Sequence, residues 1–297
     1  LAPFDPAQVA SGSPGVGLMF AIAAFIGFEA TAIFRDEARD PDRTIPRATY
    51  MAVIGIGIFY TVASWGLVMA WGPSGIVDAA AADPGSLILR TMATYLGAAG
   101  EIITNVLLIT SMFACVLSFH NVLTRYQHSM AAAGVLPERL SGVHHHHLSP
   151  HVSSLVQTGT SVVLIAVFAL FQLDPVLQVF TWFAGVATLA IAILMALTSV
   201  AVIVYFARTR TDRRLWNTIL APALGFVGLV LSAALIVAYF PIMVGDVDAD
   251  GAPAFGGVSW FLLALVLVFP AAGYVQARWI RARRPLAYAK LTDAIAG

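Results

Sequence analysis

Phe25-Ile26-Gly27-Phe28-Glu29-Ala30 lies in the middle of the first apolar run of the chain, residues 15–34. This run is long enough to cross a membrane as a helix, yet it carries a glycine and a carboxylate close to mid-depth. An ionised carboxylate at that depth is costly, which makes Glu29 a candidate functional group. Gly27 marks a place where a helix can unwind and present backbone polar groups to a ligand. We therefore predict a broken membrane helix with a ligand site at the break.

The composition identifies the class of protein. The chain has 297 residues, of which 59% are hydrophobic and only 11% charged, with a mean hydropathy of +0.85. Soluble domains carry roughly 25% charged residues, so the composition predicts an all-α polytopic membrane protein. The net charge of zero argues against a nucleic-acid partner. The single cysteine, Cys115, excludes an internal disulfide and a multi-cysteine metal site.

Seven runs are long enough to span a bilayer, because a hydrocarbon core about 30 Å thick needs about 20 helical residues. These predicted spans are residues 15–34, 48–71, 97–120, 151–172, 177–206, 218–244 and 258–278. After Asp83-Pro84-Gly85 we predict a short surface helix over 87–96. The helix that starts at 97 continues to about 133 and so must bend or protrude from the membrane.

The basic residues predict the orientation. Every Lys and Arg except Arg90 falls in the loops after spans one, three and five or in the tail. The positive-inside rule makes this side cytoplasmic, with the N-terminus outside and the C-terminus inside the plasma (inner) membrane. A chain that starts outside without a signal sequence is expected to be a fragment that has lost earlier spans.

Glu29 has two possible roles. It is either a hydrogen-bonded carboxyl group that faces neighbouring helices, or a functional group that carries protons or orients a cationic substrate. We favour the second role because Gly27 is adjacent. If residues 27–29 unwind, free amides near Ala30 and free carbonyls near Ile26 meet at the gap. Such a gap suits the carboxylate and the amine of an amino acid.

Other motifs do not predict chemistry. The run Asp246–Gly251 alternates acids like a calcium loop but lacks the glutamate at the twelfth position. The tract His144–His147 lies in an ordinary loop, and we predict no metal and no cofactor. Gly72-Pro73-Ser74-Gly75 fits the pattern of an intramembrane serine protease, but it lies in a predicted turn outside the second span. The metalloprotease motif His-Glu-x-x-His is absent from the sequence. We therefore do not expect an enzyme.

Several motifs together resemble one family. They are Phe25–Glu29, Asp36-Glu37-Ala38-Arg39-Asp40-Pro41, Arg43-Thr44-Ile45-Pro46-Arg47-Ala48, Asn121-x-x-x-Arg125, Met130-x-x-x-Gly134-Val135-Leu136-Pro137 and Ser149-Pro150-His151. This set resembles the amino acid permeases of the amino acid–polyamine–organocation (APC) superfamily, from the sixth helix onward. The resemblance covers essentially the whole chain.

The resemblance implies a LeuT-like transporter of twelve helices with a core of two five-helix inverted repeats. The chain then holds helices six to twelve: a loop remnant (1–14), the second repeat (15–206), two peripheral helices (207–278) and a cytoplasmic tail (279–297). It implies substrate binding at Ile26, Gly27, Phe28 and Glu29, with proton coupling at Glu29. It also implies that Cys115 and Phe119, one turn apart, face the same cavity. The implied partners are an amino acid or amine, protons, the lipid bilayer and the missing N-terminal helices.

One departure concerns the outer lid over the substrate. Many relatives place an aromatic residue where this chain has Ala23, so we assign the gating role to Phe20 or Phe25. A sodium-coupled carrier or an exchanger of amino acids or polyamines stays open as an alternative. A seven-helix receptor or photoreceptor would share the topology, but the last span, 258–278, has no lysine for a retinal Schiff base.

Overall fold

The computed structural model describes residues 6–7, 12–33, 38–147, 149–283, 285 and 288. Within these residues, six helical segments are long and apolar enough to cross a membrane. These are α4 (Pro41–Trp71), α6 (Leu87–Ala132), α7 (His151–Leu170), α8 (Thr181–Thr209) with the preceding wide turn Pro175–Phe180, α9 (Ala221–Val244) with the preceding wide turn Trp216–Leu220, and α10 (Gly257–Arg283). Most of the predicted loop 1–14 and of the tail 279–297 lies outside the described residues.

The first predicted span differs from the other six because it is discontinuous. It consists of α2 (Pro14–Ala23) and the short α3 (Ala30–Ile33), with residues 24–29 in turns between them. The predicted break in this span is therefore confirmed, and it is longer than the expected 27–29. The prediction of a helical polytopic membrane protein is also confirmed.

The helix ends follow from local chemistry. Pro41 and Pro175 stand in the first turns of their helical segments, where the missing N–H of proline costs nothing. Asp174 caps its segment, because its Oδ1 accepts hydrogen bonds from the amides of Val176 (2.9 Å) and Leu177 (2.6 Å). The segment that begins at Pro175 starts close to its predicted span, whereas α4 starts at Pro41, seven residues before the predicted span 48–71.

The chain forms two compact units. Unit 1 comprises residues 1–26 and 173–270, and unit 2 comprises residues 27–172 and 271–297. Unit 1 therefore contains α2, α8, α9 and the first part of α10, whereas unit 2 contains α3, α4, α5 (Gly75–Ala82), α6, α7 and the last turns of α10. The boundary between Ile26 and Gly27 falls within the break.

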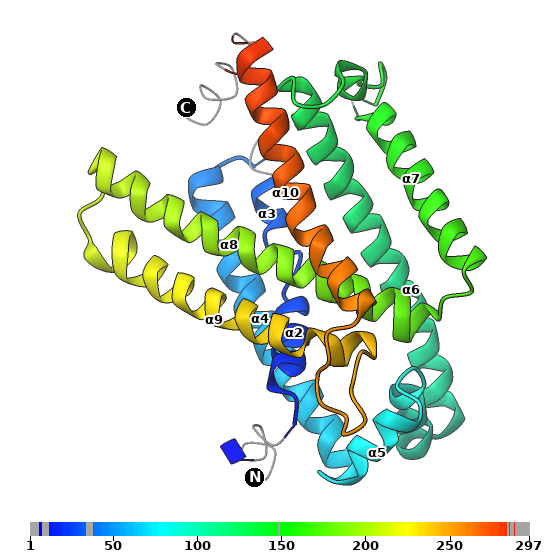
Figure 1. Ribbon diagram of the computed structural model, residues 1–297. Helices are drawn as coiled ribbons and strands as arrows, with labels where there is room; N and C mark the ends of the chain where they lie inside the picture. The colour runs from blue at the N-terminus through cyan, green and yellow to red at the C-terminus, as the bar shows by residue number, and fades with distance from the viewer. Residues whose placement is uncertain are drawn as a thin grey trace. The chain divides into compact units, whose positions relative to one another are not determined.

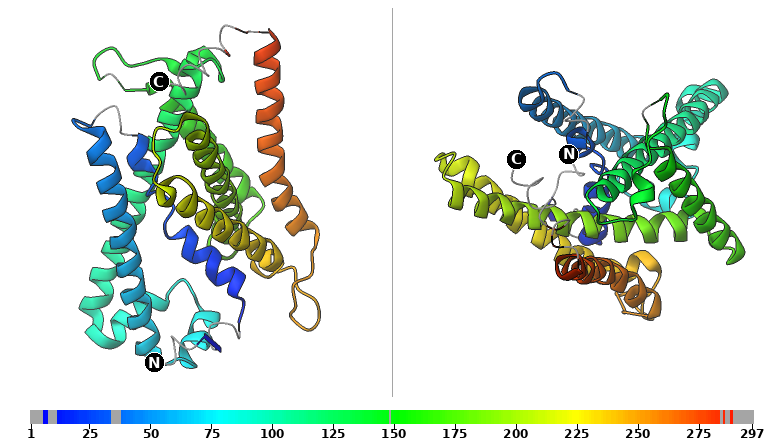
Figure 2. Two further views of the ribbon diagram at one scale, coloured as in Figure 1. Left: turned by 90° about the vertical axis from the view of Figure 1, so that its left-hand side faces the viewer. Right: turned by 90° about the horizontal axis from the view of Figure 1, so that it is seen from above.

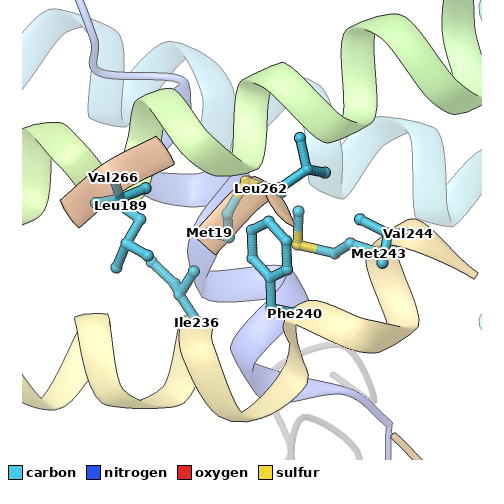
Figure 3. Close-up of a cluster of buried hydrophobic side chains, with 8 residues drawn as sticks. All are labelled: Met19, Leu189, Ile236, Phe240, Met243, Val244, Leu262 and Val266. Carbon is cyan, nitrogen blue, oxygen red and sulfur yellow. The ribbon is translucent and has the colours of Figure 1, made fainter. Parts of the chain in front are cut away.

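The core of unit 1 forms where α2, α8 and α10 contribute side chains around α9. In it α8 packs along α9, as Figures 1 and 2 show. The buried cluster comprises Met19, Leu189, Ile236, Phe240, Met243, Val244, Leu262 and Val266 (Figure 3). Because lipid is as apolar as these side chains, close packing holds such helices together, and small residues at the contacts favour it. Gly185 of α8 is one of them, since a Cβ there would collide with Met243.

The loop between α9 and α10 in unit 1 is a small structured clasp. Val247 and Pro253 form an antiparallel bridge, and Asp248 Oδ1 accepts hydrogen bonds from the amides of Asp250 (3.0 Å) and Ala252 (2.8 Å). Asp246 Oδ2 accepts hydrogen bonds from both the amide (2.9 Å) and the hydroxyl (2.6 Å) of Ser259. These bonds lower the pKa of Asp246 and tie the loop to the start of α10.

Unit 2 is organised around α6, which bends at Gly97 (φ 67°) between the predicted surface helix and the predicted span. This bend confirms the prediction of two helical segments over 87–133. The indole of Trp71 donates a hydrogen bond to Thr91 Oγ1 (2.7 Å), and the hydroxyl of Tyr95 donates one to the carbonyl of Ala70 (2.7 Å). The first segment of α6 is thus bound to the end of α4, beside a largely apolar cavity of about 980 Å³.

Two polar pairs join α6 to α7 in unit 2. One hydrogen bond joins His120 Nε2 and Ser154 Oγ (2.9 Å), and Gln127 Nε2 donates another to Gln157 Oε1 (2.8 Å). Interhelical hydrogen bonds of this kind stabilise packed membrane helices by about 1 kcal/mol.

Candidate functional site

The break between α2 and α3 is a run of tight turns. Backbone hydrogen bonds three residues apart replace the helical pattern, from Ile26 to Ala23 (3.1 Å) on one side and from Ala30 to Gly27 (3.1 Å) on the other. Gly27 has φ +111°, a conformation that residues with a side chain rarely adopt. Glycine at this position therefore lets the chain leave the helix.

Backbone polar groups are left free at this break. Among the described residues, the amides of Phe28 and Glu29 and the carbonyls of Phe25 and Ile26 have no hydrogen-bond partner. Unpaired backbone groups at membrane depth are tolerated where they line a cavity or meet a ligand. The break thus offers both donors and acceptors within four residues.

Glu29 is half-buried and its carboxylate folds back onto the break. Its Oε2 accepts a hydrogen bond from the amide of Gly27 at 2.9 Å. No basic side chain of the described residues forms an ion pair with it. The structure identifies the Gly27 amide as the hydrogen-bond partner of Glu29.

Two threonines attach α3 to α4 in unit 2. The hydroxyls of Thr31 and Thr49 lie 2.7 Å apart, and Thr31 Oγ1 also donates to the carbonyl of Phe28 (3.0 Å). The sequence analysis did not single out these residues. Their signal was a hydroxyl two positions after Glu29 in an apolar run, but spacing alone does not name the partner on α4.

The remaining predicted site residues are divided between the two compact units. Phe20 is on α2 and is exposed, whereas Phe25 and Ile26 are half-buried in the turns; all three belong to unit 1. In unit 2, Cys115 and Phe119 lie four residues apart on α6, so they share one face, and both are exposed. Although α3 packs against α6, no hydrogen bond or ring contact among the described residues joins Cys115 or Phe119 to residues 27–29.

No group of three or more His, Cys, Asp or Glu side chains in the described part of the chain is arranged to hold a metal ion. In the histidine tract the rings of His144 and His147 stack with centroids 4.9 Å apart, and His144 Nδ1 accepts hydrogen bonds from two backbone amides. The carboxylate of Asp246 accepts two hydrogen bonds from Ser259. Residues Asp36 and Glu37 of the recognised motif lie outside the described residues.

Comparison with curated proteins and with solved structures gave no match. The amino acid permease family model matches residues 12–287, which includes the break, all six long helices of the described residues and the motifs that carry the resemblance. This match excludes the receptor and photoreceptor alternatives, and it is a match to transporters rather than enzymes. The chain therefore belongs to the amino acid permease family of multi-pass membrane transporters.

Proposed function

We propose that this permease moves amino acids across the plasma membrane in symport with protons, and that the break between α2 and α3 contributes to the substrate site. Glu29 is the observation that carries the proposal. It is the only charged residue between positions 15 and 34, and its carboxylate lies against the Gly27 amide. Charged groups inside membrane spans commonly mark ion or proton pathways.

The free backbone groups at the break complement the two ends of an amino acid. The amides of Phe28 and Glu29 are donors for a carboxylate, and the carbonyls of Phe25 and Ile26 are acceptors for an ammonium group. Glu29 supplies a negative charge beside them. This combination of donors, acceptors and charge supports a zwitterionic or amine-bearing substrate.

Further parts of the proposal rest on the sequence. In it, the chain corresponds to helices six to twelve of a LeuT-like fold, with residues 15–206 as the second inverted repeat. Cys115 and Phe119 line the substrate cavity, and Phe20 or Phe25 closes it from outside. The distribution of basic residues supports an outside N-terminus and a cytoplasmic C-terminus.

The test replaces Glu29 with glutamine in the complete permease, reconstituted into proteoliposomes. Because the glutamine Oε1 can still accept the Gly27 N–H, the change removes the titratable group and leaves this hydrogen bond possible. We expect uptake driven by a proton gradient to be lost, while exchange of labelled for unlabelled substrate across the membrane continues.

Glu101 provides a matched control, because it is an exposed carboxylate on α6 and Glu101→Gln removes the same charge. This variant should retain gradient-driven uptake. Full gradient-driven uptake by Glu29→Gln would overturn the coupling role. Uptake that follows an imposed sodium gradient and ignores the proton gradient would favour the sodium-coupled alternative.

A further inference from the structure

The turn that joins α8 to α9 in unit 1 encloses a second, polar cavity. α8 ends at Thr209, and Arg210 then adopts a left-handed conformation (φ 53°) that reverses the chain. The cavity beside this turn has a volume of about 370 Å³ and is lined in part by Phe206, Arg210 and Arg213. The turn joins the ends of two long apolar segments (Figure 1). The ends of membrane-spanning segments are where headgroups and water are reached.

The charged residues around this cavity are mostly basic. Residues 208–214 contain four arginines and one acid, Asp212. The Asp212 Oδ1 accepts hydrogen bonds from the amide (2.9 Å) and the Nε (3.3 Å) of Arg214, and the bond from the amide lowers the pKa of Asp212. Asp212 is therefore ionised and paired with Arg214.

This pairing leaves Arg210 and Arg213 with uncompensated charge. Both are exposed, both line the cavity, and neither has an ion-pair partner among the described residues. Guanidinium groups bind phosphate oxygens through parallel N–H donors, so two of them at one cavity favour a phosphate-bearing anion.

Apolar side chains flank the same cavity. Leu215 and Trp216 follow the arginines directly and are 65% and 61% exposed, and Ile219 lines the cavity wall. Exposed tryptophan beside basic residues is typical of the boundary between headgroups and acyl chains. A free anion needs only the arginines, whereas a lipid also needs an apolar surface that continues away from them.

We propose that this cavity binds the headgroup phosphate of an anionic phospholipid, with Arg210 and Arg213 as the phosphate ligands and with acyl chains against Leu215 and Trp216. Basic pockets between membrane helices are a recognised type of lipid site. The residues of this site are separate from those of the break between α2 and α3.

The experiment measures lipid binding to the purified full chain by native mass spectrometry in detergent. The probes are phosphatidylglycerol and phosphatidylcholine with identical acyl chains, each titrated against the wild type. We expect phosphatidylglycerol to bind more tightly. Arg210→Gln with Arg213→Gln should weaken it roughly thirtyfold, because each basic residue at an anionic surface contributes about fivefold.

Arg208→Gln is the matched control, because Arg208 belongs to the same basic segment but does not line the cavity. It should leave phosphatidylglycerol binding within about twofold of the wild type. Arg213→Gln alone should weaken binding about fivefold. Because it leaves the left-handed Arg210 unchanged, this variant still tests the site if the double variant misfolds.

Three results would overturn the proposal. Equal affinity for phosphatidylcholine and phosphatidylglycerol would show that the protein does not recognise the charge of the headgroup. Unchanged phosphatidylglycerol binding by Arg213→Gln, or an equal loss of binding in Arg208→Gln, would show that the cavity arginines do not bind the lipid phosphate. Full displacement of the lipid by millimolar inorganic phosphate would show that the site takes a free anion instead.

Discussion

Gly15 lies on the side of α2 that faces α9, where no space remains for a side chain. An added Cβ would lie 2.6 Å from Cδ2 and 2.9 Å from Cβ of Tyr239, and it would also collide with the carbonyl oxygen of Leu235. Carbon atoms in good contact lie about 3.5–4.0 Å apart. Alanine at this position therefore requires α2 and α9 to separate by roughly 1 Å.

The expected cost follows from the atoms that block the site. Overpacking a close contact costs about 1–3 kcal/mol, and a backbone oxygen that cannot rotate away places Gly15→Ala in the upper part of that range. Replacing a glycine inside a helix with alanine also stabilises the helix by up to about 1 kcal/mol, because alanine has the higher helix propensity. Gly17 lies in the same helix, and a Cβ added there has no atom within 4 Å, so Gly17→Ala should show only this stabilisation. The two variants should therefore differ by about 2–3 kcal/mol.

Thermal unfolding of the purified protein in detergent, followed by tryptophan fluorescence, measures this difference. At about 2–4 °C for each kcal/mol, Gly15→Ala should melt roughly 4–12 °C below Gly17→Ala. Equal melting temperatures for the two variants would refute the close packing of α2 on α9.

Two further variants test the break and the loop clasp. Gly27→Ala should cost about 1–3 kcal/mol through backbone strain alone, because no atom lies near the added Cβ, whereas Gly55→Ala in α4 should be neutral or stabilising. A Gly27→Ala protein that melts at the wild-type temperature would contradict this. Asp246→Asn should cost about 1 kcal/mol at neutral pH, since solvent screens the bonds to Ser259. Because the folded-state pKa of Asp246 lies below its ordinary 3.8, this difference should be present above about pH 4 and disappear as the pH falls through the folded-state pKa. A difference in melting temperature that does not diminish as the solution is acidified below about pH 4 would count against the clasp.

The membrane spans and the position of the break could be predicted because each depends on local sequence. Run length and apolar content identify a span regardless of its neighbours, and the combination of Gly27 and Glu29 is unfavourable in a continuous helix. The extent of the break could not be predicted in the same way. Residues 24–26 have ordinary helix-compatible side chains, yet their backbone is in turns.

The polar contacts at the break and in the loop clasp could not be predicted, because they join residues far apart in the chain. Thr31 pairs with Thr49 across 18 positions, and Asp246 pairs with Ser259 across 13. A sequence shows that each side chain needs a partner but not which partner the fold brings near. No partner for Asp246 was therefore predicted, although its carboxylate caps α10.

The hydrogen bond between Gly27 and Glu29 links charge to backbone geometry within the break. An ionised carboxylate accepts an amide proton more strongly than a neutral carboxyl group does. Under the proposed function, protonation of Glu29 weakens this bond and frees the Gly27 amide beside the already free amides of Phe28 and Glu29. A substrate carboxylate then gains a third donor when the proton is bound, and loses it when the proton leaves.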